Sequence, residues 1–193
     1  MHRNKKNSKK ASSNTLRIIG GRWRSRKLNF ITAPNLRPTP DRVRETLFNW
    51  LQSSIANARC LDLFAGSGAL GLEALSRGAS CVIFIEKHRA AAKQLEQNLS
   101  LLKAENTLEN TDAESYLLKA DKPFDIIFLD PPFRNNLLPN ILNSITEQQL
   151  LKANGLVYLE HEKEQSYDWE IWGLRVLKET KAGQVKSYLL KRI

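Results

Sequence analysis

The stretch that decides the fold is LDLFAGSGALGLEAL, residues 61–75, in which a short apolar run leads into glycines and then into a helical pattern. Gly66, Gly68 and Gly71 match G-x-G-x-x-G at the start of the predicted helix. Glycine allows a tight turn and lets a ligand approach the backbone, while the free amides of a helix start favour an anionic group. The stretch therefore predicts a nucleotide-type loop after a strand of an open α/β sheet.

A carboxylate follows at the distance expected for a ribose contact. Glu86 ends the next apolar run, SCVIFIE, twenty residues after Gly66. At a strand end, such a carboxylate can accept hydrogen bonds from both ribose hydroxyls of an adenosyl ligand. NAD-binding domains share this pairing, so loop and Glu86 together predict only that an adenosine nucleoside is bound.

Two further acids favour S-adenosylmethionine over NAD as this ligand. Asp62, four residues before Gly66, would repel a pyrophosphate but would suit the α-ammonium of a methionine moiety. Asp112 stands at the start of a predicted short helix, where it either accepts from the adenine amine or is a plain helix cap. The predicted cofactor is therefore S-adenosylmethionine.

Outward from this stretch, apolar runs alternate with helical patterns. The predicted helices are 69–78, 88–103 and 139–152, and the predicted strands are 59–64, 80–86, 124–130, 155–162, 169–177 and 184–193. Alternating strands and helices with an antiparallel end are typical of an open, mostly parallel sheet covered on both faces. A length of 193 residues fits one such domain, predicted over residues 15–193.

The N-terminal segment differs in composition from the rest. Residues 1–40 hold eleven Lys and Arg and no acid, whereas residues 41–193 hold nineteen basic and twenty acidic residues. A cationic arm on a balanced globule suits a phosphate-backbone partner, although a solubilising tail would have the same charge. Residues 1–14 are too polar to bury a core and are predicted to be disordered.

Residues 15–36 are predicted to form a small hairpin, and residues 37–55 a helix that leads into the core. In this helix Thr39 is predicted to cap and Pro40 to take the first helical position. The hairpin is expected to present four basic side chains to RNA. They are Arg22, Arg24, Arg26 and Lys27.

Other features restrict the setting of the protein. The N-terminal segment, residues 1–14, lacks the apolar stretch of a secretory signal. No later stretch of the sequence approaches the roughly 18 apolar residues of a membrane span. We therefore expect a cytoplasmic protein that does not bind a membrane. Cys60 and Cys81 cannot make a structural zinc site alone and are predicted to be buried free thiols, so no metal is expected.

The tetrapeptide DPPF, residues 130–133, ends the strand FDIIFLD, at the edge where open α/β sheets bind their ligands. Two prolines remove two amide donors and leave carbonyls free to accept hydrogen bonds, and Phe133 offers a stacking surface. An exocyclic base amine is a weak nucleophile because its lone pair is delocalised. If Asp130 and the Pro131 carbonyl both accept from it, they favour its reactive form, so Asp130, Pro131, Pro132 and Phe133 are the predicted catalytic residues.

These motifs together resemble one enzyme family. RIIGGRWRSRKL, RPTPDRVRETLFNWL, LDLFAGSGALGLEALSRGA, DPPF, LVYLEHE and GQVKSYLL, in this order, resemble the bacterial 16S rRNA guanine-N2 methyltransferase (RsmD) family. The resemblance implies a Rossmann-like class I methyltransferase fold with a seven-stranded sheet. It also implies that the acceptor is the 2-amino group of one guanine of 16S rRNA in the small subunit or its assembly intermediate. We also expect the protein to act as a monomer.

Carried over by position, residues 130–133 match the family's catalytic loop, and the cofactor pocket falls on five residues. These are Asp62, Phe64, Gly66, Gly68 and Glu86, to which Asp112 is added as a looser match. Within RPTPDRVRE, Arg37 and Arg42 are expected to bind RNA, and Thr39 and Arg44 are further candidates for the methionine carboxylate or a phosphate. The alternative for Arg42 and Arg44 is a solvated helix face.

Other functions fit less of the sequence. An NAD oxidoreductase would leave DPPF and the basic arm without a role. Related loops methylate amino groups of adenine, cytosine or a protein glutamine, and the basic arm favours nucleic acid among these. A DNA amino-methyltransferase is the nearest alternative, but a target-recognition domain does not fit in 193 residues. A non-enzymatic nucleic-acid-binding module would be indicated by loss of the acid of DPPF, which is present.

Overall fold

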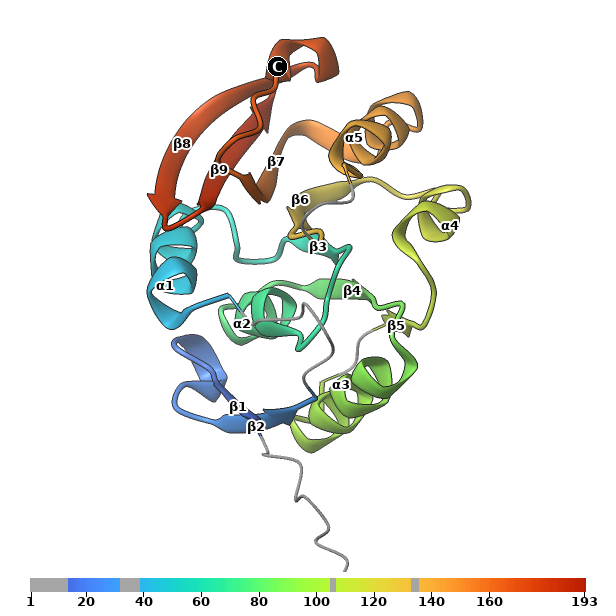
Figure 1. Cartoon of the computed structure of the whole chain (residues 1–193). Coiled ribbons are helices and arrows are strands. Elements are labelled where there is room, and N and C mark those ends of the chain that lie inside the picture. The colour runs from blue at the N-terminus through green and yellow to red at the C-terminus, as the bar shows by residue number, and fades with distance from the viewer. Residues whose placement is uncertain (1–13, 32–38, 105–106, 133–135) are drawn as a thin grey trace, which may run out of the picture.

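The computed structural model describes residues 14–31, 39–104, 107–132 and 136–193, and its main feature is one seven-stranded sheet (Figure 1). The strand order is β5-β4-β3-β6-β7-β9-β8; the first five of these strands are parallel, and β9 is antiparallel to β7. The strands are β3 (Arg59–Asp62), β4 (Cys81–Ile85), β5 (Thr107–Glu109), β6 (Phe124–Leu129), β7 (Leu151–Glu162), β8 (Leu174–Ala182) and β9 (Val185–Arg192). The predicted Rossmann-like fold is confirmed.

Helices cover both faces of this sheet, as the alternating pattern predicted. α1 (Asp41–Trp50), α2 (Ala69–Ser76) and α3 (Arg89–Leu101) pack on one face, and α4 (Ala113–Leu117) and α5 (Leu138–Glu147) pack on the other. Neighbouring residues of a strand alternate between the two resulting cores. Cys60 belongs to the first core and Leu61 to the second, as the period of two along a strand requires.

The predicted N-terminal hairpin is also present. β1 (Asn14–Arg17) and β2 (Lys27–Phe30) form a separate antiparallel pair, with the 3₁₀ turn η1 (Gly21–Trp23) between them. Asn14, which was assigned to the tail, is the first residue of β1. The rest of the tail, residues 1–13, lies outside the described residues, as do residues 32–38 of the hairpin's exit.

One buried carboxylate attaches the hairpin to the sheet. Glu73 of α2 accepts from the backbone amides of Ile19 (2.9 Å) and Gly20 (2.8 Å) and pairs with Arg77 (2.7 Å). Its fourth partner is Arg44 of α1, at 3.6 Å. The interpretation of Arg44 as part of a solvated helix face is therefore wrong, because its side chain is 1% exposed and contacts Glu73 and Asp41.

These contacts place the hairpin tip far from the glycine loop. The amide of Trp23 donates to the hydroxyl of Ser76 (3.0 Å), the last residue of α2. Gly21 has φ +75°, and a Cβ on it would strike the carbonyl of Ser76. Because α2 begins at the glycine loop and its eight residues span about 12 Å, the tip lies at the amino-terminal edge of the parallel strands.

Three local predictions need correction. α1 covers only residues 41–50 of the predicted helix 37–55; its N-cap is Pro40, and Thr39 makes no capping bond because its hydroxyl donates elsewhere. Trp169–Trp172, predicted as part of a strand, is the 3₁₀ helix η2, which Asp168 caps. The short strand β5 lies in a stretch that was read only as polar.

Two expectations about composition can be compared with the structure. Cys60 and Cys81 are both free thiols, the first buried and the second half-buried. Among the described residues, none of the helices has the length and hydropathy that a membrane crossing requires.

Candidate active site

The glycine loop lies at the carboxyl-terminal edge of the parallel strands, between β3 and α2. Gly66 and Gly68 have φ of +52° and +78°, a region that side chains rarely adopt. A Cβ on Gly68 would come within 2.5 Å of Leu95, and one on Gly71 would strike the ring of Phe84. Gly66 and Gly68 thus permit the predicted turn, and Gly71 lets α2 pack on the sheet, a role that was not predicted from the sequence.

Glu86 follows β4 at the same edge and faces this loop. One carboxylate oxygen accepts from the amide of Gly66 (2.7 Å), and the other accepts from the amide of His88 (2.6 Å). The carboxylate therefore fixes the loop, a role that the spacing alone did not reveal. Each oxygen has a further lone pair, so contacts with two hydroxyls remain compatible with this geometry.

Asp62 ends β3 below the loop and is 3% exposed. Its carboxylate accepts from the amide of Gly71 (2.9 Å). Burial raises the pKa of Asp62 to about 7, with smaller contributions from the charges of Asp130 and Glu86. The residues that the structure describes place no cation on this acid.

Asp112 caps α4, as its alternative interpretation proposed. Its carboxylate accepts hydrogen bonds from the amide (2.9 Å) and the hydroxyl (2.8 Å) of Ser115. The hydrogen bond from the Ser115 amide lowers the pKa of Asp112. Phe64 is half-buried and packs on the core under α4 and α5. Neither observation tests a contact with a ligand.

Asp130 follows β6 at this edge, directly before Pro131 and Pro132. The hydroxyl of Thr39, 91 positions earlier, donates to its carboxylate (3.2 Å), which is the contact that replaces the predicted cap. Burial raises the pKa of Asp130 to about 6. Phe133 lies outside the described residues, and so does Arg37.

A second acid, missed in the sequence, lies beside Asp130. Glu160 is 6% exposed on β7 and accepts from the hydroxyl of Tyr158 (2.5 Å). Burial, and then the charge of Asp130, raise the pKa of Glu160 to about 8. The segment LVYLEHE could have indicated this acid, because its apolar run ends in acidic residues and belongs to the strand that pairs with FDIIFLD.

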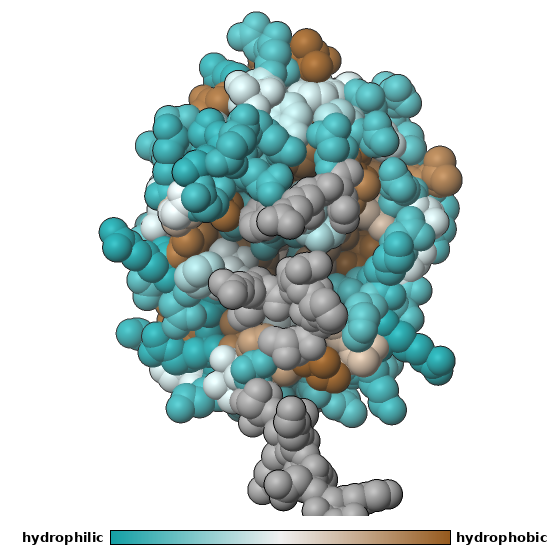
Figure 2. Space-filling model, in the orientation of Figure 1, coloured by the Kyte–Doolittle hydropathy of each residue, from teal (hydrophilic) through white to brown (hydrophobic). Residues whose placement is uncertain are grey.

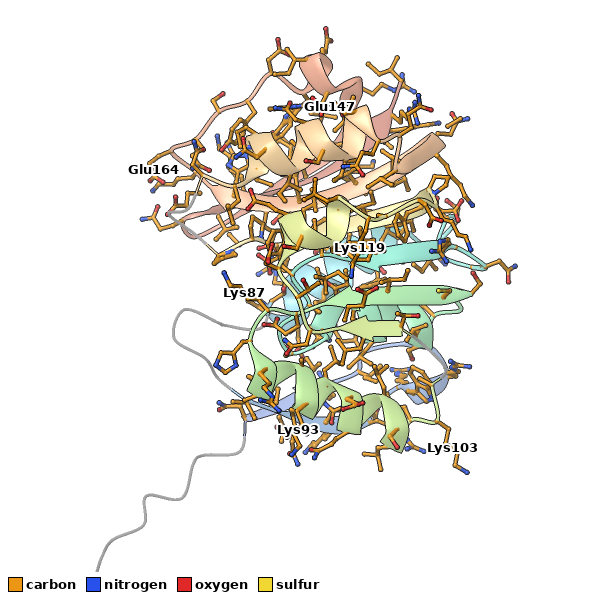
Figure 3. The ribbon with its side chains drawn as sticks, turned by 90° about the vertical axis from the view of Figure 1, so that its right-hand side faces the viewer. Lys87, Lys93, Lys103, Lys119, Glu147 and Glu164 are labelled. Carbon is orange, nitrogen blue, oxygen red and sulfur yellow. The ribbon has the colours of Figure 1, made fainter. Side chains whose placement is uncertain are left out.

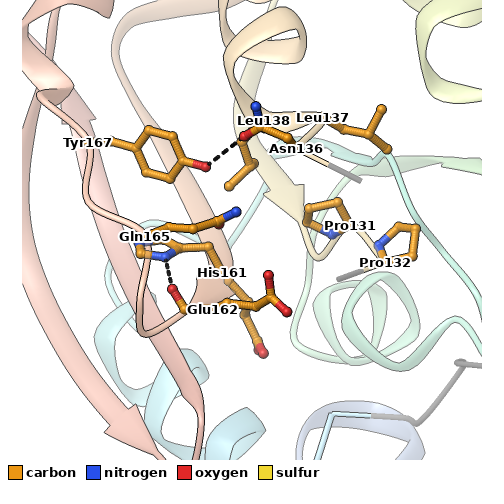
Figure 4. Close-up of a pocket in the computed structure, with 10 residues that line it drawn as sticks. Pro131, Pro132, Asn136, Leu137, Leu138, His161, Glu162, Gln165 and Tyr167 are labelled. Carbon is orange, nitrogen blue, oxygen red and sulfur yellow. Dashed lines mark hydrogen bonds between the residues drawn. The ribbon is translucent and has the colours of Figure 1, made fainter. Parts of the chain in front are cut away.

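A pocket opens between these acids and the C-terminal part of the sheet (Figure 4). It is partly open to solvent. Its lining residues are Pro131, Pro132, Asn136, Leu137, Leu138, Glu160, His161, Glu162, Gln165 and Tyr167. The pocket therefore joins the prolines after Asp130 to Glu160 and to an aromatic wall.

His161 forms the aromatic wall of this pocket. Its ring stacks on Tyr188 at 5.3 Å and 9°, and its Nδ1 bonds the carbonyl of Glu162 at 2.8 Å. Burial lowers the pKa of His161, which favours the neutral ring. In the described residues no group of three His, Cys, Asp or Glu side chains is arranged to hold a metal ion.

The predicted RNA-binding residues do not gather at this edge. Arg22, Arg24, Arg26 and Lys27 are exposed, but they surround the hairpin tip at the opposite edge. Figure 3 shows both edges: Lys87 and Glu164, after β4 and β7, lie on one side of the molecule, and Lys103, after α3, lies on the other. Arg42 is exposed on α1.

Two lysines at the carboxyl-terminal edge were missed. Lys181 of β8 and Lys186 of β9 are directly opposite each other beside the turn of these strands, and Lys186 also pairs with His161 in register. Like charges in this position are destabilising, and no ion pair with any described residue offsets them. Figure 2 views this edge of the molecule, where hydrophilic residues cover most of the face.

The chain is similar to known proteins over almost its whole length. The family model described as conserved hypothetical protein 95 matches residues 16–191. Ribosomal RNA small subunit methyltransferase D of Escherichia coli K12 is 48% identical over 183 residues, 94% of this chain and 92% of the relative. The protein of the same name from Haemophilus influenzae is 46% identical over 181 residues, 91% of this chain and 92% of the relative.

A solved structure has the same fold. The Escherichia coli protein yhhF superposes with a TM-score of 0.83 at 47% identity, over 93% of this chain and 98% of the other.

Proposed function

Since the chain belongs to the RsmD family, described as conserved hypothetical protein 95, we propose that it methylates the 2-amino group of one guanine in 16S rRNA. The methyl donor is S-adenosylmethionine. The observation that carries this proposal is the position of Asp130 and Pro131, which follow β6 at the edge of the sheet that also carries the glycine loop, with Pro131 lining a pocket. Acceptors at this position suit an amine that is to be alkylated.

The described residues fit the donor. Asp62 is a buried acid without a cation, which the α-ammonium of the methionine moiety would supply. Gly66 and Gly68 have positive φ, a Cβ on Gly68 would strike Leu95, and Glu86 beside this loop would accept from the ribose hydroxyls. Phe64 and Asp112 would complete the adenosine end of the site. Bound there, S-adenosylmethionine supplies an activated methyl group on a sulfonium.

Asp130 orients the acceptor amine. Its carboxylate is positioned by the Thr39 hydroxyl, and together with the Pro131 carbonyl it accepts the two amine hydrogens. These contacts favour the pyramidal amine and offset the positive charge that grows on nitrogen. With a pKa of about 6, Asp130 is too weak a base to deprotonate an aryl amine before transfer, but it can take the proton that the alkylated nitrogen releases.

Pro132 and Phe133 follow Pro131 in the sequence. Pro132 lines the pocket and lacks an amide donor, so it presents no hydrogen-bond donor that would compete with Asp130 for the amine. Phe133 would stack on the target base.

The partner is the small ribosomal subunit or an assembly intermediate of it. Arg22, Arg24, Arg26 and Lys27 would hold rRNA phosphates at one edge of the protein, and Arg37 and Arg42 are further candidates for phosphate contacts. The unpaired Lys181 and Lys186 give the site edge basic residues of its own. RNA that contacts both edges must cross the length of α2, which a folded rRNA helix can do.

The test is to map the transferred methyl group. The protein is incubated with labelled S-adenosylmethionine and, in separate reactions, small subunits, free 16S rRNA, DNA and total protein from a strain that lacks its gene. We expect label on one guanine of 16S rRNA, identified by nuclease digestion and mass spectrometry. Label on DNA, on protein or on another base would overturn the proposal, and stronger binding of NAD than of S-adenosylhomocysteine would overturn the cofactor.

A further inference from the structure

Glu160 and Asp130 form a pair of buried acids on neighbouring strands. β6 and β7 are parallel, with Phe128 opposite Tyr158 and Leu129 opposite Leu159. Phe128 and Tyr158 both belong to the core under α1, α2 and α3, so the residues two positions later, Asp130 and Glu160, leave the sheet on the same side. Burial raises the pKa of Glu160, and the charge of Asp130 raises it further, which indicates that the two acids lie close together.

The groups around this pair are acceptors or neutral donors. Tyr158 of β7 donates its hydroxyl to Glu160, and Thr39 donates to Asp130. β9 places Ser187 opposite Glu160 in register. The ionisable groups that face Glu160 are Asp130 and Tyr158, and no described cation bonds to it.

A purely structural role explains this arrangement poorly. A glutamine would accept the Tyr158 hydroxyl equally well without the cost of burying a charge next to another acid. A ligand that brings hydrogen-bond donors would repay that cost. Glu160 also lines the pocket that begins at Pro131 and Pro132, so such a ligand can reach it.

The bases differ in what stands beside their exocyclic amine. In guanine, the ring nitrogen N1 next to the 2-amino group carries a hydrogen. In adenine and in cytosine, the ring nitrogen next to the amine is an acceptor. An edge that offers acceptors only, namely Asp130, the Pro131 carbonyl and Glu160, therefore pairs with guanine and repels the other two bases.

We propose that Glu160 selects guanine by accepting the N1–H of the target base while Asp130 accepts from its 2-amino group. The inference rests on the proposed function and adds a specificity-determining residue to it. Only the ionised carboxylate is a pure acceptor, so base entry displaces the proton that the pair holds near neutral pH. Substrate affinity consequently rises as the pH is raised from about 6 to about 8.

The experiment is single-turnover methyl transfer to unmethylated small subunits at saturating S-adenosylmethionine, between pH 6 and pH 8. We expect Glu160→Gln to lower the rate at subsaturating subunits by about 10- to 100-fold at pH 8, as for loss of one specific base contact, and to flatten the pH profile. Glu164→Gln is the matched control: it removes one acid from an exposed position outside the pocket and should keep the wild-type profile.

A second substrate tests base selection directly. On subunits reassembled with 16S transcripts whose target guanine is replaced by adenine, wild type should transfer no methyl group. Glu160→Gln should reduce the ratio of the transfer rate on guanine-containing subunits to the rate on adenine-containing subunits. The reason is that the glutamine amide can donate to N1 of adenine. Unchanged S-adenosylhomocysteine affinity and thermal midpoint will show that the variant is folded. If Glu160→Gln is not folded, Tyr158→Phe is tested instead. It removes the hydroxyl that donates to Glu160 and should shift the pH profile of the rate to higher pH than in wild type.

The outcomes separate the two proposals. If wild type methylates no rRNA base, the proposed function fails. If wild type methylates guanine, and Glu160→Gln or Tyr158→Phe retains its rate, pH profile and base preference, the function stands and the role of Glu160 is wrong.

Discussion

Buried acids at the two edges of the sheet have different surroundings. Glu73, near the amino-terminal edge, is fully buried and has two arginines and two backbone amides as partners. Asp62, Asp130 and Glu160, at the carboxyl-terminal edge, have an amide or a hydroxyl but no cation among the described residues. The pKa of each of these three is raised, to about 7, 6 and 8 respectively.

The difference is the one expected between an acid that holds the fold together and the acids that we propose bind ligands. The contacts of Glu73 are complete within the chain, and they join the hairpin, α1 and α2. The other three have no cation among the described residues; a sulfonium ligand with an α-ammonium would bring positive charge, and a base amine would bring hydrogen-bond donors. Five predictions compare the two edges, beginning with the largest expected effect and ending with the smallest.

The largest effect is expected at Glu73. Glu73→Ala should lower the free energy of unfolding by about 3 to 5 kcal/mol, because it removes the one acceptor that joins the Ile19 and Gly20 amides to Arg77. Arg44 loses its contact with Glu73 but keeps its ion pair with Asp41 (2.6 Å). Urea unfolding measures the loss.

Asp62→Asn is the matched variant at the other edge. The new amide oxygen still accepts from the Gly71 amide, and a buried charge is removed, so stability should change by less than about 1 kcal/mol. Cofactor affinity, in contrast, should fall. Equal losses of stability in the two variants would contradict the distinction between the edges.

At Asp130 we expect a loss of rate with no loss of stability. Asp130→Ala should keep cofactor affinity and cut turnover by a factor on the order of 10² to 10³, the usual result of losing one preorganised polar group. Asp130→Asn should retain more activity than Ala, because its amide oxygen still accepts from the amine. Single-turnover rates at saturating cofactor check both. An Asn variant as inactive as Ala would show that charge or proton transfer matters more than orientation.

Glu86 combines both roles and should give an intermediate result. Glu86→Ala should weaken S-adenosylmethionine binding by about 2 to 3 kcal/mol, since it removes charge-assisted contacts to the ligand and frees the Gly66 and His88 amides. Calorimetry measures the affinity. Glu86→Gln serves as the control, because it keeps an acceptor for one of the two amides. An unchanged affinity in the Ala variant would remove Glu86 from the site.

The smallest effect is expected from the basic side chains. Replacing Lys181 and Lys186 with Ser should weaken the salt dependence of binding to small subunits. The slope of log affinity against log salt should become less negative by about 1 to 2, and cofactor binding should not change. The same replacement of Arg22 and Arg24 tests the opposite edge with an equal change of charge. A wild-type slope in the second variant would confine the rRNA contact to the carboxyl-terminal edge.

The sequence by itself determined the features that local pattern encodes. The period of the apolar residues predicted the alternation of strands and helices, and the spacing of Gly66, Gly68 and Glu86 predicted a loop faced by a carboxylate. The alternation depends on residues that are close in the chain, and the placement of Glu86 depends on the rule that successive strands of such a fold are usually neighbours. The position of Asp130 at a strand end followed from the same local reading.

Only the tertiary structure decided how distant segments meet. Thr39 was read as a cap, but folding brings it to Asp130, and the register of β6 and β7 brings Glu160 beside the same acid. Arg44 could have been a surface residue, but α1 packs it against Glu73. The bond from Trp23 to Ser76 holds the basic hairpin tip at the edge away from the site. A local pattern contains neither register nor docking, because both are set by packing between segments that the chain keeps apart.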